Sequence, residues 1–305
     1  MADRRDRPGV RSSSGAHARL AACILAVCAL PLAGCRYDVF DARGPVGQAD
    51  ALITLDALVI MLAIVVPTIL ATFGFAWWFR ASNTRARYRP DWSFSGRLEL
   101  LVWAIPILVI MFLGGVIWIG SHELDPAQPL PSSAKTPPLN VQVVSMDWKW
   151  LFIYPDQKVA SVNRLVAPVG TPVHFTLTSS SVMNVFFVPQ LGSMIYTMNH
   201  MADQLWLQAD HPGSYLGESG QFSGDGFSDM TFAFDAVSPQ AFAGWVKGAQ
   251  ASGPVLDSAG YRALLAQSSH VRPYTYRAPA PGLFQDIVDQ KLPPGPGPGD
   301  VAQPK

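Results

Sequence analysis

Two long apolar stretches without a charged residue constrain this chain more than any other feature of its sequence. They cover residues 57–79 and 100–120. A helix rises about 1.5 Å per residue, so roughly 20 apolar residues span the hydrocarbon core of a bilayer, which is about 30 Å thick. The sequence therefore predicts a helical hairpin with membrane spans at about 52–79 and 99–120, in preference to two buried helices of a soluble domain.

The charges beside these spans predict which ends face the cytoplasm. The connecting loop, residues 80–98, contains five arginines and one carboxylate, Asp91. From Ser121 to the end there are ten basic and fourteen acidic residues. Because short loops rich in Arg remain in the cytoplasm, the loop is predicted to be cytoplasmic and the C-terminal domain periplasmic. Together with the lipoprotein signal described below, this orientation places the hairpin, residues 35–120, in a bacterial inner membrane.

The overall composition agrees with lipid contact and excludes a nucleic-acid partner. Apolar residues make up 49% of the chain and charged residues 14%, against about 25% charged in soluble domains. Basic and acidic residues number 22 each, so the formal net charge is zero. A chain without net positive charge has no bulk attraction for a phosphate backbone.

The N-terminus has the pattern of a bacterial lipoprotein signal. Five arginines precede an apolar run, residues 20–32, that is too short to span a bilayer. The run leads into Leu-Ala-Gly-Cys, which resembles a lipobox, whose Cys is acylated and becomes the mature N-terminus. Residues 1–34 are therefore predicted to be a signal peptide and Cys35 the lipidated residue, the alternative being a plain signal with an accidental cysteine. Cleavage would remove Cys23 and Cys28, leaving neither a disulfide nor a two-cysteine metal site.

Alternating apolar and polar residues after the second span predict an all-β domain over residues 139–237. A linker with five prolines, residues 121–138, precedes it. Short alternating segments between Pro and Gly turns are typical of an antiparallel sandwich or barrel. They are residues 146–154, 173–178, 185–188, 205–209 and 230–234. Most of the aromatic side chains are expected in the core, whereas Trp148 and Trp150 could instead form a docking surface.

A C-terminal extension, residues 238–292, is predicted to be partly helical. Ser238 followed by proline is typical of an N-cap with Pro at the first helical position, and predicts a helix to about Ala249. A second short helix is expected over 261–267. Residues 293–305 are rich in Pro and Gly and are predicted to be a disordered tail.

These features, in this order, resemble subunit II of the haem–copper terminal oxidases. The run Glu-Leu-Leu-Val-Trp-Ala-Ile-Pro, residues 99–106, looks like the family's signature in the second span. Residues 144–150, 181–184 and 189–193 look like the quinol-oxidising branch. The resemblance covers about residues 35–290 and implies that the β domain is a cupredoxin-like Greek-key sandwich.

The resemblance also implies a sandwich without metal. In the cytochrome c oxidases of this family, a dinuclear copper A centre is bound by one His and a Cys-x-Glu-x-Cys-x-x-x-His-x-x-Met loop. The matching residues here include no Cys and no His; they are Asn184, Ser219, Gln221, Ser223, Phe227 and Met230. A lone thioether is a weak ligand for copper. We therefore expect no metal and no cofactor in this chain, and no electron transfer from cytochrome c.

The quinol-oxidising branch implies a proton-pumping ubiquinol oxidase of the cytochrome bo type in an aerobic respiratory chain. The haems, copper and ubiquinol site would lie in subunit I, with subunits III and IV as further partners. This chain would be a structural and proton-uptake subunit without a catalytic residue of its own. The alternative is a membrane-anchored cupredoxin-like lipoprotein with a binding or assembly role, which would need no signature in the second span.

Glu99, at the cytoplasmic mouth of the second span, is the candidate functional residue of the membrane region. A carboxylate there is costly unless it is hydrated or paired. A structural interpretation is an interfacial Glu that reaches water or pairs with Arg97. The family resemblance implies instead that Glu99 lies near the entrance of a proton path through subunit I, and this is the expectation that we adopt.

Overall fold

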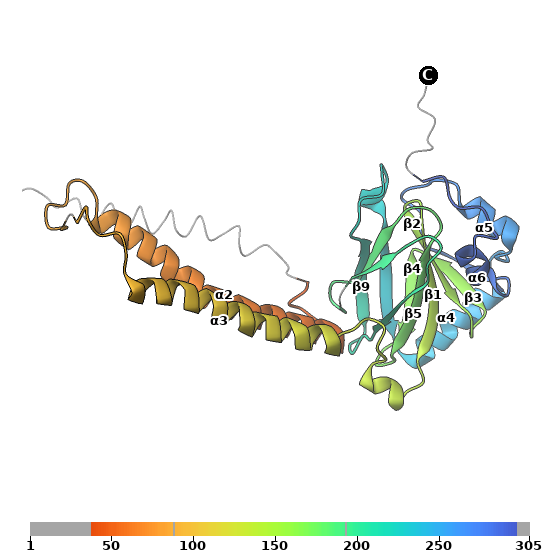
Figure 1. Cartoon of the computed structure of the whole chain (residues 1–305). Helices are drawn as coiled ribbons and strands as arrows, with labels where there is room; N and C mark the ends of the chain where they lie inside the picture. Colours follow the sequence, from red (N-terminus) through yellow and green to blue (C-terminus); the bar gives the residue numbers. More distant parts are fainter. Residues whose placement is uncertain (1–37, 88, 193, 298–305) are drawn as a thin grey trace, which may run out of the picture. The chain divides into compact units, whose positions relative to one another are not determined.

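The computed structural model describes residues 38–297 except Tyr88 and Ser193 (Figure 1). The predicted signal peptide and the predicted lipidation site, Cys35, lie outside the described residues. Residues 298–305 also lie outside them.

Two long helices, α2 (Pro45–Trp78) and α3 (Gly96–Glu123), form the predicted hairpin. Both are long and apolar enough to cross a membrane, and their most apolar windows contain no residue buried within the protein. Apolar side chains exposed over a whole helix are disfavoured in water but not in lipid. Both helices are longer than the spans predicted for them. α2 begins at Pro45, whose fixed φ suits the first helical turn.

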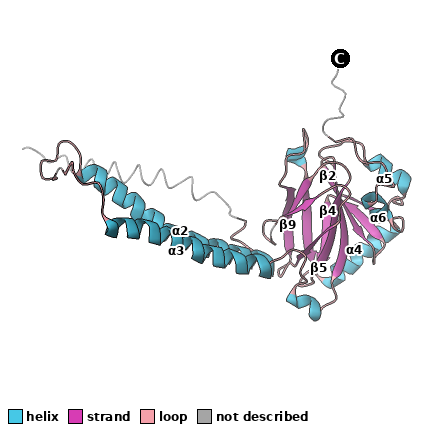
Figure 2. Ribbon diagram, viewed as in Figure 1, coloured by secondary structure: helices cyan, strands magenta, loops and turns pink. Residues whose placement is uncertain are grey.

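The C-terminal domain is a sandwich of two sheets, drawn in magenta in Figure 2. The first sheet has the order β11 (Tyr274–Arg277), β3 (Val159–Val162), β2 (Lys149–Tyr154), β1 (Leu139–Met146), β5 (Val173–Ser179) and β8 (Asp203–Leu207). The second has the order β4 (Arg164–Pro168), β10 (Thr231–Val237), β9 (Gly213–Ser219), β6 (Asn184–Phe187) and β7 (Ile195–Thr197). The predicted alternating segments overlap β2, β5, β6, β8 and β10.

Two strand pairings are parallel, which corrects the predicted antiparallel arrangement. β1 pairs with β5, placing Val141 opposite Phe175, and β4 pairs with β10, placing Leu165 opposite Phe234. Two neighbouring strands can be parallel only if the chain between them returns to the end of the sheet where the first strand began. Here that returning chain consists of the strands that lie between the two partners in sequence. Alternation along a strand predicts which face is buried but carries no information about the direction of the neighbouring strand.

The predicted single strand over 146–154 is divided by a turn. β1 ends at Met146, and Trp148 has a φ of 65°, in the left-handed region that turns use. Trp150 and Trp148 are 0% and 9% exposed. Both therefore belong to the core, and the docking surface considered for them is wrong.

The first sheet is buried on both faces. Trp150 and Phe152 point into the core between the sheets, and Leu151 points into a second core under the C-terminal extension. That extension contains α4 (Pro239–Ala251), α5 (Ser258–Leu264) and α6 (Leu283–Val288). Two short 3-10 helices, Pro131–Ala134 and Phe227–Asp229, lie in the connections of the domain. Double coverage explains why the burial of β2 is continuous rather than alternating.

The extension largely follows the sequence prediction. The Ser238 hydroxyl accepts a hydrogen bond from the backbone N–H of Ala241 at 3.2 Å, which confirms the N-cap. α5 begins and ends three residues before the predicted helix at 261–267. The predicted start of the disordered tail at Pro293 differs from the structure, because residues up to Gly297 are placed against the sandwich by hydrogen bonds of their backbone N–H groups.

Candidate functional site

The residues at the copper A positions gather at one end of the second sheet. Asn184 begins β6, Ser219 ends β9, and Met230 directly precedes β10. Ser223 lies in the loop between β9 and β10. All four are buried, with at most 7% of each residue exposed. We call the six predicted positions the copper-position cluster: Asn184, Ser219, Gln221, Ser223, Phe227 and Met230.

The polar atoms of this cluster contact one another. The Ser219 hydroxyl donates to Asn184 Oδ1 at 3.2 Å and lies 3.4 Å from the backbone oxygen of Gln221. The Ser223 hydroxyl lies 4.0 Å from the sulfur of Met230. Phe227 packs against Phe222 with ring centroids 5.7 Å apart.

The chemistry of these groups does not fit a copper A centre. The cluster contains two hydroxyls, two amides, an aromatic ring and one thioether, and neither a thiolate nor an imidazole. Within residues 38–297, Tyr88 and Ser193 aside, no three His, Cys, Asp or Glu side chains are grouped so that they could hold a metal ion.

Trp148 fixes the loop that carries the cluster. Its indole N–H donates to the backbone oxygen of Ser223 at 3.0 Å. A Cβ atom added to Gly226 would lie 2.4 Å from the same indole ring, so the loop backbone packs directly on it. The indole N–H of Trp150 reaches the backbone oxygen of Met230 at 3.4 Å. These contacts define the loop without any metal ligand.

The residues on either side of Trp148 form a second buried cluster, which the sequence analysis did not identify. Asp147 and Lys149 are 5% and 2% exposed. Asp147 accepts hydrogen bonds from the Ser181 hydroxyl at 2.5 Å, from the Gln267 side chain at 3.3 Å and from the backbone N–H of Gly297 at 3.0 Å. We call Asp147 and Lys149 the charged cluster.

Lys149 connects the same turn to the C-terminal extension. Its ammonium group donates to the backbone oxygen of Ala266 and to the Ser268 hydroxyl, both at 2.7 Å. Burial lowers the pKa of Lys149 to about 8, and the nearby Asp147 opposes this shift. The Asp-Trp-Lys run was visible in the sequence, but its alternation suggested that both charges face away from the core.

Glu99 lies in the first turn of α3, and its side chain is exposed. Its backbone N–H donates to the backbone oxygen of Ser95 at 3.0 Å. In the described part of the chain its carboxylate forms no ion pair, so the pairing with Arg97 is not observed. A carboxylate in the first turn is favoured by the helix dipole, and from there it is accessible to water.

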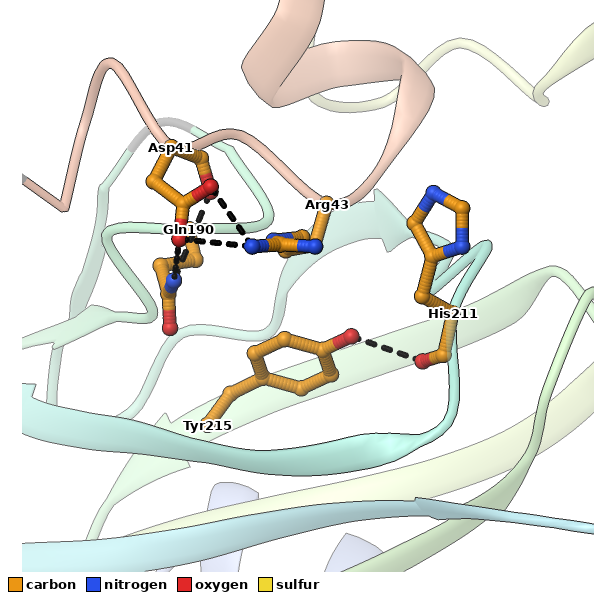
Figure 3. A network of polar contacts seen from close by, with 5 residues as sticks. All are labelled: Asp41, Arg43, Gln190, His211 and Tyr215. Carbon is orange, nitrogen blue, oxygen red and sulfur yellow. Dashed lines mark hydrogen bonds and ion pairs between the residues drawn. The ribbon is translucent and has the colours of Figure 1, made fainter.

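A further polar network that the sequence analysis missed fastens the segment before α2 to loops of the sandwich (Figure 3). Arg43 forms an ion pair with Asp41 at 2.7 Å, and the Gln190 side chain donates to Asp41 at 3.2 Å. The carboxylate raises the pKa of Arg43. Beside them, the Tyr215 hydroxyl donates to the backbone oxygen of His211 at 2.6 Å.

The backbone of this segment and of the first turn of α2 adds three hydrogen bonds to loops of the sandwich. Arg43 N–H donates to Gln190 O at 2.7 Å, Asp210 N–H to Arg43 O at 2.8 Å, and Gly47 N–H to the backbone oxygen of Leu191 at 3.0 Å. A Cβ atom on Gly44 would lie 2.0 Å from the backbone oxygen of Gln208, so only glycine fits there. Two glycines and a proline at the start of an apolar helix were the available signal in the sequence.

Comparison with known proteins agrees with this architecture. A family model described as cytochrome c oxidase subunit II, periplasmic domain, matches residues 156–237. Ubiquinol oxidase subunit 2 of Acetobacter aceti is 50% identical over 261 residues, covering 85% of this chain and 84% of that protein. Cytochrome bo(3) ubiquinol oxidase subunit 2 of Pseudomonas aeruginosa is 45% identical over 260 residues, covering 85% and 78%.

A more distant relative extends the comparison. Quinol oxidase subunit 2 of Bacillus anthracis is 36% identical over 239 residues, covering 77% of this chain and 81% of that protein. The predicted family and the predicted hairpin-plus-sandwich fold are confirmed. With such identity over most of both chains, this protein belongs to the ubiquinol oxidase subunit 2 family.

Proposed function

We propose that this chain is the non-redox subunit 2 of a proton-pumping ubiquinol oxidase, where it has a structural and a proton-uptake role. The copper-position cluster is the observation that carries this proposal. Its buried positions are filled by neutral groups that contact one another, so an electron from cytochrome c would find no acceptor at these positions. The relatives' names support this function over the alternative of a binding or assembly lipoprotein.

The remaining parts of the enzyme belong to its partners in this proposal. Subunit I supplies the haems, the copper and the ubiquinol site, and subunits III and IV complete the complex. The sandwich lies in the periplasm and the loop between α2 and α3 in the cytoplasm, in keeping with its five arginines. Acylation of Cys35 adds a lipid anchor to the two spans.

The absence of a redox centre is tested on the purified complex with the full chain. We expect ubiquinol, but not reduced cytochrome c, to support oxygen consumption. Met230→Leu should leave the ratio of copper to haem and the near-infrared spectrum unchanged. A loss of copper in Met230→Leu would show that the cluster does hold metal and would contradict the proposal.

Glu99 is proposed as the proton-entry residue. An exposed carboxylate in the first turn of α3 takes up a proton from water and passes it to a path in subunit I. Glu99→Ala should lower ubiquinol oxidase turnover severalfold at an unchanged haem spectrum, and Glu99→Asp should give an intermediate rate. Asp91→Asn, in the adjoining loop, is the matched control and should retain full turnover. Wild-type oxygen consumption per haem in Glu99→Ala would return Glu99 to a structural role.

A further inference from the structure

A basic pocket lies in the loop between the two membrane helices. Its volume is about 700 Å³, and it is lined by three cationic side chains, two aromatic side chains and an amide, among others. These residues are Arg80, Arg87, Arg89, Phe79, Trp92 and Asn83. No acidic residue lines the pocket, although Asp91 is close in sequence.

One wall of the pocket is built by the end of α2. The Arg80 guanidinium donates to the backbone oxygen of Trp77 at 2.8 Å and lies 4.9 Å from the centre of the Trp77 indole. The Asn83 side chain donates to the backbone oxygen of Trp78 at 2.5 Å. Both contacts satisfy carbonyl groups that a helix leaves free at its C-terminus. The position of Arg80 is therefore fixed by the helix end before any ligand arrives.

The other two cations of the pocket are Arg87 and Arg89. In the described part of the chain, neither Arg87 nor Arg89 forms an ion pair or a side-chain hydrogen bond, and both are exposed. Each guanidinium can therefore offer a planar pair of N–H donors to an oxyanion, the geometry that favours phosphate. Several cations around one cavity without a carboxylate favour an anionic ligand.

The aromatic walls of the pocket and its position next to α2 indicate which kind of anion binds there. Phe79 and Trp92 are 58% and 60% exposed. The pocket directly follows a helix long and apolar enough to span a membrane, and aromatic side chains are enriched at the ends of such helices, where they contact lipid headgroups. A free inorganic ion would make no use of these rings, whereas an amphipathic molecule would contact both the rings and the guanidinium groups.

We propose that this pocket binds the headgroup of an anionic phospholipid. The lipid phosphate contacts Arg87 and Arg89, and Phe79 and Trp92 pack against the glycerol and the upper acyl carbons. Basic segments next to a membrane helix attract anionic lipid through each cation near the surface. This site would bind lipid at the boundary of the enzyme whether or not Glu99 carries protons.

A simpler account is that the five arginines only orient the hairpin, without a defined site. The loop provides its own control, because Arg85 and Arg97 carry the same charge but do not line the pocket. The double variants Arg87→Gln/Arg89→Gln and Arg85→Gln/Arg97→Gln both remove two positive charges. Only a defined site predicts that the two variants differ.

The experiment uses the purified oxidase complex in detergent. Short-chain phosphatidylglycerol is titrated, and bound lipid is counted by native mass spectrometry, with phosphatidylcholine and inorganic phosphate as further probes. We expect Arg87→Gln/Arg89→Gln to weaken phosphatidylglycerol binding by at least about thirtyfold, because each substitution removes a charge-assisted contact with the lipid phosphate. Arg85→Gln/Arg97→Gln should retain binding within about threefold of wild type, because these charges do not line the pocket and act on the lipid only through solvent.

Trp92→Ala keeps every charge and serves as a second variant if the double variant fails to assemble. It should weaken binding of phosphatidylglycerol but leave the weak binding of inorganic phosphate unchanged. Equal losses in the two double variants, or equal binding of phosphatidylglycerol and phosphatidylcholine by wild type, would overturn the site. Displacement of phosphatidylglycerol by an equal concentration of inorganic phosphate would overturn the assignment to a phospholipid.

Discussion

Two clusters meet at the Asp147–Lys149 turn, and they differ in the charge of their buried groups and in the length of their hydrogen bonds. Trp148 faces the copper-position cluster, whose groups are neutral and held by contacts of 3.2 to 4.0 Å. Asp147 and Lys149 are charged and buried, and their shortest hydrogen bonds are 2.5 Å, from the Ser181 hydroxyl of the sandwich to Asp147, and 2.7 Å, from Lys149 to the backbone oxygen of Ala266 in the C-terminal extension. A buried neutral group tolerates a weak partner, whereas a buried charge needs several strong ones. We therefore expect substitutions in the charged cluster to destabilise the sandwich more than substitutions in the copper-position cluster.

The largest expected effect is at Asp147. Asp147→Ala removes the acceptor for Ser181, Gln267 and the N–H of Gly297. Loss of a buried charge with three partners should lower the free energy of unfolding by about 3 kcal/mol. Urea unfolding of a soluble fragment, residues 125–297, measures it, and Asp225→Ala at an exposed position is the control. Equal stabilities of the two variants would show that the charged cluster is dispensable.

A smaller loss is expected where the loop packs on Trp148. Gly226→Ala would place a Cβ atom 2.4 Å from the indole ring, which must then shift. Such overpacking costs about 1–3 kcal/mol. Gly244→Ala is the matched control, because a Cβ atom there meets nothing within 4 Å and the residue lies inside α4. The control should gain about 0.5–1 kcal/mol from its helix propensity. A stable Gly226→Ala fragment would mean that the loop is loosely packed.

The third effect is a pH dependence that only the charged cluster should show. The pKa of Lys149 is lowered to about 8 in the folded state, so between pH 8 and its ordinary pKa near 10.5 the unfolded chain binds more protons. Stability should therefore rise with pH, by about 2 kcal/mol from pH 7.5 to 9.5. Above this window the buried tyrosines, whose pKa is raised in the folded state, act in the opposite direction.

The control for this pH dependence is Lys149→Met, which fills a similar volume without a titratable group. The wild-type fragment should gain stability relative to the Lys149→Met fragment as the pH rises, and the difference between their urea midpoints measures this gain. Parallel curves for wild type and Lys149→Met would show that Lys149 does not titrate in this range.

Much of this architecture was predictable, and the failures have a physical cause. The membrane spans were predicted from the length of the uncharged stretches, and the start of α4 was predicted from Ser238. Both predictions succeed because the signals are local in sequence. The burial of Asp147 and Lys149 was missed because alternation assumes one solvated face, whereas the C-terminal extension covers the outer face of the first sheet. The Asp41–Arg43–Gln190 network was missed for a related reason: its partners lie 149 residues apart.

The smallest effects are expected in the copper-position cluster. Ser219→Ala removes one 3.2 Å contact with Asn184, and Ser223→Ala removes a 4.0 Å contact with a thioether. Each should change the free energy of unfolding by less than about 1 kcal/mol, because neither leaves a charge without a partner. Adding copper(II) should leave the thermal midpoint of the wild-type fragment unchanged, since metal binding stabilises a fold only where ligands exist to hold the ion. A stoichiometric rise of the midpoint that Ser219→Ala abolishes would reverse the ranking of the two clusters, because the neutral groups would then be ligands and not simply packing.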